Sequence, residues 1–207
     1  MGDITIELNE TAAPSTSANF QAYVENNFYD GTIFHRVIDG FMIQGGDPLS
    51  KSDDKSRHGT GGNAAKYFGI GTETDESTWN LPAEFSPRSH ERGILSMARS
   101  QDPDSGGSQF FICVADAPFL DNKYTVFGKV VSGLDVVDQI VNVPRDPRDN
   151  PNERIEMKVR LNAAVKSASS NQGGGGTFGE TLPLQAGSNL VFSDGKSRSF
   201  IVTDINK

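Results

Sequence analysis

The sequence predicts a mainly β fold, either an antiparallel barrel or a sandwich, with two α-helices. Apolar runs of strand length recur along residues 1–165, and turns that contain Gly or Pro separate them. Two further stretches carry apolar residues at helical spacing. A chain of 207 residues can bury a sizeable core as one domain, with or without an appendage.

The first strand and the first helix are predicted from the spacing of apolar residues, which changes from every second residue to every third or fourth. Residues 3–8 alternate between polar and apolar side chains, as in a half-buried strand. A helix is expected to begin at Pro14, because proline suits the first turn of a helix. Its apolar positions are Phe20, Tyr23, Val24 and Phe28. Residues 30–31 should then turn the chain into a strand at Ile33.

Two short strands flank a Gly-containing turn at residues 39–41, and a Gly-Gly-Asp sequence ends the second strand. A two-residue loop would place Arg36 opposite Ile43, whereas a three-residue loop would place Arg36 opposite Gln44. We favour the three-residue loop, because it gathers Arg36 and Gln44 beside Met42 on one face. Such a face suits an uncharged amide ligand that carries an apolar ring.

The rest of residues 1–165 continues the alternation of strands and turns. Residues 48–92 are polar, rich in Gly, Ser, Thr and Asp, and without clear periodicity, so they are expected to run as a long excursion over the surface of the fold. Strands are then expected at residues 93–98, 109–114, 126–131 and 155–161, with a second helix at residues 133–141. Of the adjacent Phe110 and Phe111, only one can face the core, and we assign Phe110 inward.

Charge and hydropathy exclude several classes of partner. The net charge of −8 at pH 7 and the lack of a Lys/Arg cluster argue against nucleic acid. No window approaches the ~18 consecutive apolar residues of a membrane span, and the N-terminal residues do not resemble a signal peptide. The default location is therefore cytoplasmic. Because Met1 directly precedes a strand pattern, a different natural start and a secreted or periplasmic location stay open.

The titratable side chains predict no metal site and no cofactor. The single Cys113 lies in an apolar run, where a buried inert thiol is expected, and it excludes a disulfide framework. His58 and His90 lie in loops without partners at ligand spacing. His35 lies on the opposite face from Arg36 and is expected to be a hydrogen-bonded structural histidine. The Asp-rich residues 146–153 miss the EF-hand spacing.

Several dispersed segments, in the same order, resemble the cyclophilins, a family of peptidyl-prolyl cis-trans isomerases. The matching segments are residues 34–36, 40–47, 92–98, 107–112, 119–121 and 126–130. The resemblance covers about residues 1–165. It implies a closed eight-stranded antiparallel barrel capped by two α-helices, with a proline site on its outer face. It also implies an enzyme that rotates X-Pro peptide bonds of peptides and unfolded proteins and so assists protein folding.

The resemblance assigns roles to particular residues. Arg36 and Gln44 take the catalytic positions, and Gln44 with Gln109 resembles the pair of amides that holds the substrate backbone. The positions that resemble the substrate-binding site are Phe41, Met42, Ala98, Arg99, Gln109, Phe111, Phe119, Leu120 and Tyr124. Among them, Phe119 stands where tryptophan is common and Tyr124 where histidine is common. Both substitutions resemble bacterial members, and the first implies at most weak cyclosporin binding.

The C-terminal residues suggest an unusual arrangement. Residues 166–176 read as a Gly/Ser-rich linker, and residues 177–207 as a β segment with a hairpin signal at residues 193–196. Read on into residues 1–4, the last strand resembles the uninterrupted start of a cyclophilin. We hypothesise that it fills a missing first strand, as in a circular permutation. A swapped dimer and a separate tail are the alternatives, and a monomer is the expected state.

A second function from a different class competes with the isomerase. The same groove would serve a proline-peptide binding module or chaperone that has little turnover. Arg36 argues for catalysis, whereas the substitutions at Phe119 and Tyr124 leave room for a binding module.

Overall fold

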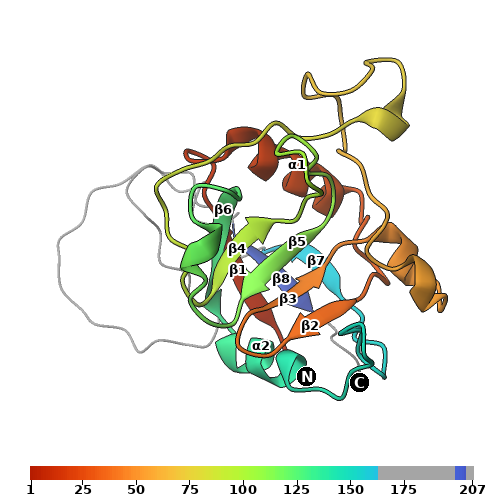
Figure 1. The fold of residues 1–207 in the computed structure, drawn as a ribbon, viewed down its shortest axis with the longest axis vertical. Coiled ribbons are helices and arrows are strands. Elements are labelled where there is room, and N and C mark those ends of the chain that lie inside the picture. The colour runs from red at the N-terminus through yellow and green to blue at the C-terminus, as the bar shows by residue number, and fades with distance from the viewer. Residues whose placement is uncertain (163–198, 204–207) are drawn as a thin grey trace, which may run out of the picture.

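The computed structural model describes residues 1–162 and 199–203, which form an antiparallel sheet with two α-helices. The strands are β1 (Ile4–Leu8), β2 (Arg36–Ile38), β3 (Met42–Gly45), β4 (Ile94–Met97), β5 (Phe110–Cys113), β6 (Val126–Ser132), β7 (Lys158–Leu161) and β8 (Ser199–Thr203). Their order in the sheet is β2-β3-β5-β4-β6-β1-β8-β7. The helices α1 (Pro14–Glu25) and α2 (Leu134–Val141) lie at opposite ends of the sheet (Figure 1). The mainly β prediction is confirmed.

The predicted closed eight-stranded barrel is wrong. Within the described part of residues 1–165, seven strands form, and the strand order is open with β2 and β7 at its two ends. The segment that precedes β2 does, however, approach the segment that precedes β7. An isolated bridge joins Ile33 to Glu156, and the Phe34 amide donates to the Ile155 carbonyl at 3.0 Å. Because these contacts do not continue into a ladder, Ile33 forms no strand and β7 is shorter than predicted.

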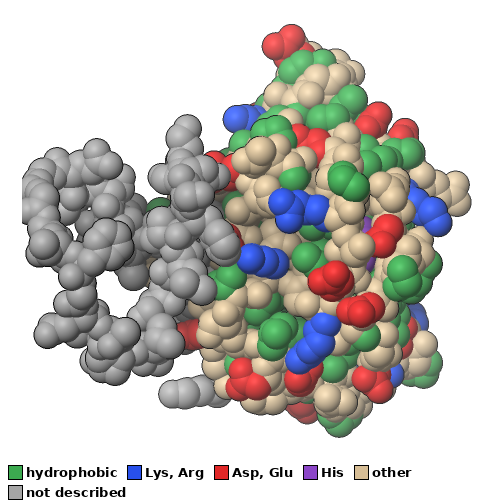
Figure 2. Space-filling model, turned by 90° about the vertical axis from the view of Figure 1, so that its left-hand side faces the viewer, with side chains coloured by type: hydrophobic (Ala, Val, Ile, Leu, Met, Phe, Trp, Pro, Cys, Tyr) green, Lys and Arg blue, Asp and Glu red, His purple; other side chains and the backbone are tan. Residues whose placement is uncertain are grey.

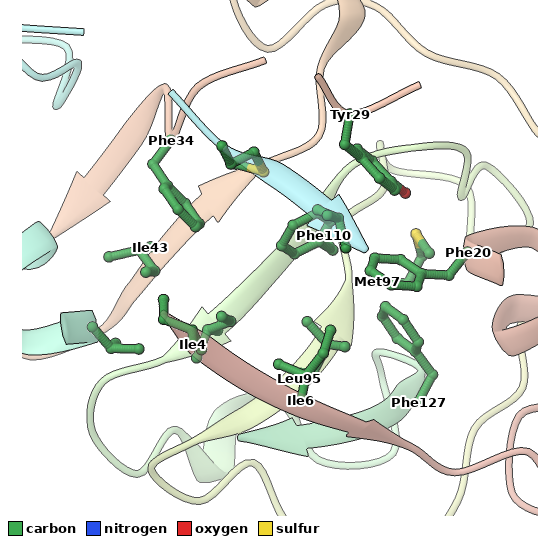
Figure 3. Close-up of a cluster of buried hydrophobic side chains, with 14 of the residues drawn as sticks. Ile4, Ile6, Phe20, Tyr29, Phe34, Ile43, Leu95, Met97, Phe110 and Phe127 are labelled. Carbon is green, nitrogen blue, oxygen red and sulfur yellow. The ribbon is translucent and has the colours of Figure 1, made fainter. Parts of the chain in front are cut away.

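The sheet and both helices contribute side chains to the core. Phe20 of α1 is fully buried, and its ring lies 5.6 Å from Phe110 and 5.7 Å from Phe127, measured between centroids. Ile4 and Ile6 of β1 point toward the same cluster (Figure 3). Each such side chain contributes about 1.5–3 kcal/mol on burial. The alternation of residues 3–8 therefore predicted the inward face of β1 correctly.

Helix α1 begins at Pro14 as predicted but ends earlier than its apolar spacing suggested. The last helical residue is Glu25, and Asn27 takes a φ of 53°, which ends the helical path. Phe28 therefore lies beyond the helix. Its ring still packs against Tyr23 at 4.0 Å between centroids. The apolar spacing therefore predicted correctly that Phe28 packs against the core, but it placed the end of the helix too late.

Residues 48–92 carry more structure than predicted. They contain three short 3-10 helices, η1 (Pro48–Lys51), η2 (Lys55–Arg57) and η3 (Glu76–Thr78), and a part near residues 70–80 projects from the body (Figure 1). An aspartate precedes each 3-10 helix, and its carboxylate accepts a backbone N–H two residues on. These aspartates are Asp47, Asp54 and Asp75. Local capping therefore orders a segment that has no hydrophobic period.

Strand β8 lies between β1 and β7 and pairs with both. Val202 is the partner of Ile4 on one side and of Val159 on the other. The hairpin signal predicted at residues 193–196 lies outside the described residues. The antiparallel pairings of β8 with β1 and β7 are contacts between distant parts of the chain.

Surface charge is mixed on the face that Figure 2 shows. There, Lys and Arg side chains are intermixed with Asp and Glu side chains, in a chain whose net charge is −8. In the described part of the chain, no helix has the length and apolar character to span a membrane.

Candidate active site

A second apolar cluster lies apart from the core. Its buried members are Met42, Phe111, Cys113, Ala117 and Leu120, and Ile38, Phe41, Ile94, Ala98 and Tyr124 flank them. Phe110 belongs to the core and Phe111 to this second cluster, because successive side chains of a strand face opposite sides. The prediction for these two phenylalanines is confirmed. The cluster lies outside the main core, and it is the candidate proline pocket.

A row of polar side chains lies beside this pocket, on β2, on β3 and at the residue that precedes β5. The observed register pairs Arg36 with Gln44, and Gly40 takes a φ of 69° in the loop, so the predicted three-residue turn is confirmed. Arg36 is exposed and lies at 3.5 Å, Nη1 to Oε1, from Gln44. Gln44 Nε2 in turn donates to Gln109 Oε1 at 2.9 Å.

The polar row ends at Gly61, within the long segment of residues 48–92. Gln109 Nε2 donates to the Gly61 carbonyl at 2.7 Å. This bond orients the Gln109 amide, which orients Gln44, whose Oε1 then faces Arg36. Residues 48–92 therefore help to position the row. No feature of the sequence pointed to the Gln109–Gly61 contact, because it joins residues 48 apart in the chain.

The rim of the pocket is aromatic. Phe119 is 59% exposed, and its ring lies 5.4 Å from that of Phe41. Tyr124 meets Phe111 edge to face at 6.0 Å, and the Arg99 guanidinium lies over Tyr124 at 4.3 Å. These contacts hold the side chains of Arg99 and Tyr124 together at the rim.

Ala98 and Arg99 resemble positions of the substrate-binding site, and both already make hydrogen bonds within the protein. The Ala98 amide donates to the Gln109 carbonyl at 3.0 Å, so the sheet already uses that donor. A bound peptide would therefore pair with other backbone groups of residues 98–99. The Arg99 side chain is also engaged, since Nη2 donates to the Lys123 carbonyl at 2.8 Å.

A buried hydrogen-bonded histidine supports the pocket from behind. His90 bonds to Asp121 through Nδ1 at 3.0 Å and to Ser96 through Nε2 at 3.0 Å. Its ring stacks on Phe111 at 6.2 Å with an interplanar angle of 14°. The prediction from the sequence considered His90 only as a metal ligand, and it did not include these hydrogen bonds. The backbone N–H of His90, then its ring, holds the pKa of Asp121 below its usual value.

Cys113 and His35 had been expected to be inert. Cys113 is fully buried, and burial raises the pKa of its thiol to about 12, so it is not a nucleophile at neutral pH. His35 is 4% exposed, but neither ring nitrogen has a hydrogen-bond partner among the described residues. The prediction that His35 is hydrogen-bonded is therefore wrong.

An apolar cluster beside an arginine–amide row, on the face of an antiparallel sheet, suits a peptide that carries an apolar ring. The family model for "Cyclophilin type peptidyl-prolyl cis-trans isomerase/CLD" matches residues 1–161. The chain therefore belongs to the cyclophilin family and is a peptidyl-prolyl cis-trans isomerase of that type. This result confirms the resemblance of the dispersed segments.

Known relatives agree with this assignment. A "Peptidyl-prolyl cis-trans isomerase" of Acinetobacter baylyi is 46% identical over 149 residues, which cover 70% of this chain and 69% of the relative. A "Peptidyl-prolyl cis-trans isomerase-like 3" of Dictyostelium discoideum is 42% identical, over 79% of this chain and 91% of the relative. A cyclophilin-type isomerase of Cryptosporidium parvum, solved in the presence of the dipeptide Ala-Pro, superposes with a TM-score of 0.61 at 32% identity, covering 74% of this chain and 93% of that one.

Proposed function

We propose that Arg36 is the catalytic residue for rotation about X-Pro bonds in this chain. Amide resonance sets a barrier of about 18–20 kcal/mol, while the two isomers differ by only about 0.5–1 kcal/mol. The reaction therefore needs no nucleophile and no proton transfer. It needs a group that favours the twisted bond, in which the imide nitrogen regains a lone pair. The exposed Arg36 guanidinium beside the apolar pocket supports this role.

The contribution of Arg36 follows from the change in the substrate. A hydrogen bond from Arg36 to the imide nitrogen or the adjacent carbonyl is stronger in the twisted state than in the planar one. A charge-assisted hydrogen bond contributes about 1.5–3 kcal/mol, which corresponds to roughly one or two decades of rate. Gln44, whose Oε1 faces Arg36, helps to position the guanidinium and is proposed as the second catalytic position.

The remaining site residues supply binding and orientation. The proline ring would lie against Phe41, Met42, Phe111 and Leu120, with Phe119 and Tyr124 at the rim. Gln44 and Gln109, together with the backbone of Ala98 and Arg99, would hold the flanking peptide. Holding the chain on both sides of the bond reduces the entropy that the transition state must lose.

The substrates would be proline-containing peptides and unfolded proteins, so the chain would assist protein folding. A related structure solved with Ala-Pro supports a peptide ligand. Weak cyclosporin binding is expected because Phe119 replaces the common tryptophan. A binding module or chaperone with little turnover is the competing function, and the exposed Arg36 favours the enzyme.

The division of the chain is also a proposal. Residues 1–165 would be the catalytic domain, residues 166–176 a linker, and residues 177–207 a segment that supplies β8 as in a circular permutation. The pairing of β8 with both β1 and β7 supports this division. A monomer that uses its own β8 is favoured, and a swapped dimer is the alternative.

The cis-to-trans exchange rate of an Ala-Pro peptide, measured by NMR, tests the enzyme and its arginine. The Arg36→Ala variant should lose about 10- to 100-fold in rate, because it lacks the charge-assisted bond. Arg88→Ala, which removes an exposed arginine outside the site, is the matched control and should keep the wild-type rate. Equal rates in wild type and Arg36→Ala would contradict the mechanism. Binding of the peptide without acceleration by wild type would favour the binding module.

A further inference from the structure

A second pocket shares Arg36 and Gln44 with the active site. It holds about 250 Å³ of space, and Gly59 forms part of its wall. Gly59 takes a φ of 86°, and a Cβ at this position would lie 3.4 Å from His35 Nε2. The wall therefore passes close to the His35 ring. None of the proposed roles in proline binding uses this pocket beyond the two shared residues.

The lining of this pocket is basic. Arg36, Lys55 and Arg148 contribute three cations, and the residues that line the pocket include no Asp or Glu. Lys55 Nζ donates to the Pro151 carbonyl at 2.7 Å, which holds the side chain in place without neutralising its charge. Asp146 lies near enough to interact with Arg148 and Lys55, but it is not part of the lining.

Two buried side chains in the pocket have unsatisfied polar atoms. His35 is 4% exposed and Asn150 is 3% exposed. Both ring nitrogens of His35 and the Oδ1 atom of Asn150 lack a hydrogen-bond partner among the described residues. Buried polar atoms without partners destabilise a fold unless a ligand or water completes them. The wall of the pocket therefore contains one buried N–H donor, on the neutral His35 ring, and one buried acceptor, Asn150 Oδ1, that no described residue satisfies.

The orientation of Asn150 is set by its neighbour. His58 Nε2 lies 2.8 Å from the Ser52 carbonyl, so it carries the proton, and Nδ1 then accepts from Asn150 Nδ2 at 3.0 Å. This arrangement leaves Asn150 Oδ1 as a buried acceptor at the pocket. An acceptor beside several cations suits a ligand that carries an N–H group as well as a negative charge. An acidic residue within a peptide has both.

We propose that this pocket is a subsite for the carboxylate of an Asp or Glu near the proline of the substrate. The proposal rests on the proposed function, because Arg36 belongs to both sites. Lys55 and Arg148 would bind the carboxylate, and a buried His35 nitrogen would donate to it. Asn150 Oδ1 would accept a backbone N–H of the peptide. The enzyme would therefore prefer acidic sequences around proline, although its own net charge is −8.

Paired peptides that differ only in charge test the subsite. Each pair carries Glu or Gln at one position before or after the proline, and kcat/KM and Kd are measured for both at low salt. Wild type should prefer Glu at one position by about fivefold, the size of one exposed charge pair. The preference should fall toward one in Arg148→Gln and in Lys55→Gln, and it should weaken with salt. Arg88→Gln should retain the wild-type preference.

The outcomes separate this proposal from the proposed function. Equal kcat/KM and Kd for Glu and Gln peptides at every position would overturn the subsite while leaving the isomerase intact. A preference that persists in both Arg148→Gln and Lys55→Gln would overturn it as well. Wild type that turns over neither peptide would contradict the proposed function. In that case a Glu preference in Kd that Arg148→Gln abolishes would still support the pocket.

Discussion

At the scale of single residues, the buried environment of His35 limits the stability of the fold in acid. Burial is the main cause that lowers the pKa of His35 to about 4; His58 and Arg36 act in the same direction, and Asp47 and the Ile33 backbone oppose the shift. The unfolded chain binds this proton near pH 6.5. Between about pH 6.5 and 4, the unfolded state therefore holds more protons than the folded state, so stability falls as pH falls.

We predict that the free energy of unfolding decreases by about 3 kcal/mol through His35 alone as the pH drops from 7 to 4. A His35→Phe variant should lose less stability over this range, because it has no proton to bind in the unfolded state. Urea unfolding at several pH values measures the difference. Parallel curves for wild type and variant would contradict a buried neutral His35. The exposed Arg88→Ala chain serves as a reference for the intrinsic acid response.

At the scale of elements, α1 is capped from a distant part of the chain. Ala13 at its N-terminus offers no side-chain acceptor. Instead, the Glu84 carboxylate accepts from the Ser15 amide at 2.9 Å and from the Thr16 amide at 2.8 Å. The negative charge also lies at the positive end of the helix dipole. Residues 48–92 therefore stabilise the helix that carries Phe20 into the core.

Replacing Glu84 tests this remote cap. Glu84→Gln should lower the free energy of unfolding by about 1 kcal/mol. The substitution removes the negative charge and leaves one side-chain oxygen to accept from the two backbone N–H groups at the helix start. Glu73→Gln, an exposed change in the same segment, is the control and should leave stability within about 0.5 kcal/mol. Thermal unfolding followed by circular dichroism compares the two variants. A larger loss in Glu73→Gln than in Glu84→Gln would argue against the cap.

At the scale of the whole molecule, β8 joins β1 to β7 across the sheet. Without it, β1 would have one unpaired edge and β7 would have no partner strand in the sheet. Val202 pairs on both sides, so a proline there would remove a ladder N–H and place its ring inside a strand that has neighbours on both edges. We propose that the fold depends on this strand, although the family match ends at residue 161.

Val202→Pro should cost about 3 kcal/mol or more, which corresponds to a fall in Tm of roughly 6–12 °C. Deleting residues 177–207 should lower Tm as well, and a peptide of residues 196–207 added in excess should restore it. A scrambled peptide of the same composition should have no effect. An unchanged Tm in both variants would support a separate tail. Gel filtration of the full chain distinguishes a monomer from a swapped dimer.

Local sequence determined the features that depend on neighbouring residues. The alternation of residues 3–8, the three-residue turn that pairs Arg36 with Gln44, and the opposite faces of Phe110 and Phe111 were all predicted correctly. Each follows from the two-residue period of a strand or from turn geometry. The same patterns located both helices, although the end of α1 was misplaced. The positions that resemble the proline site were also evident from short motifs.

Only the tertiary structure decided which distant groups meet. Glu84 reaches the start of α1, Gln109 bonds to Gly61, and His90 stacks on Phe111. The sheet remains open between β2 and β7 because only isolated contacts join them. Hydrogen bonds and desolvation act on atoms brought together by the whole fold, and no local period records them. For the same reason, the unpartnered nitrogens of His35 became visible only when the pocket around them was formed.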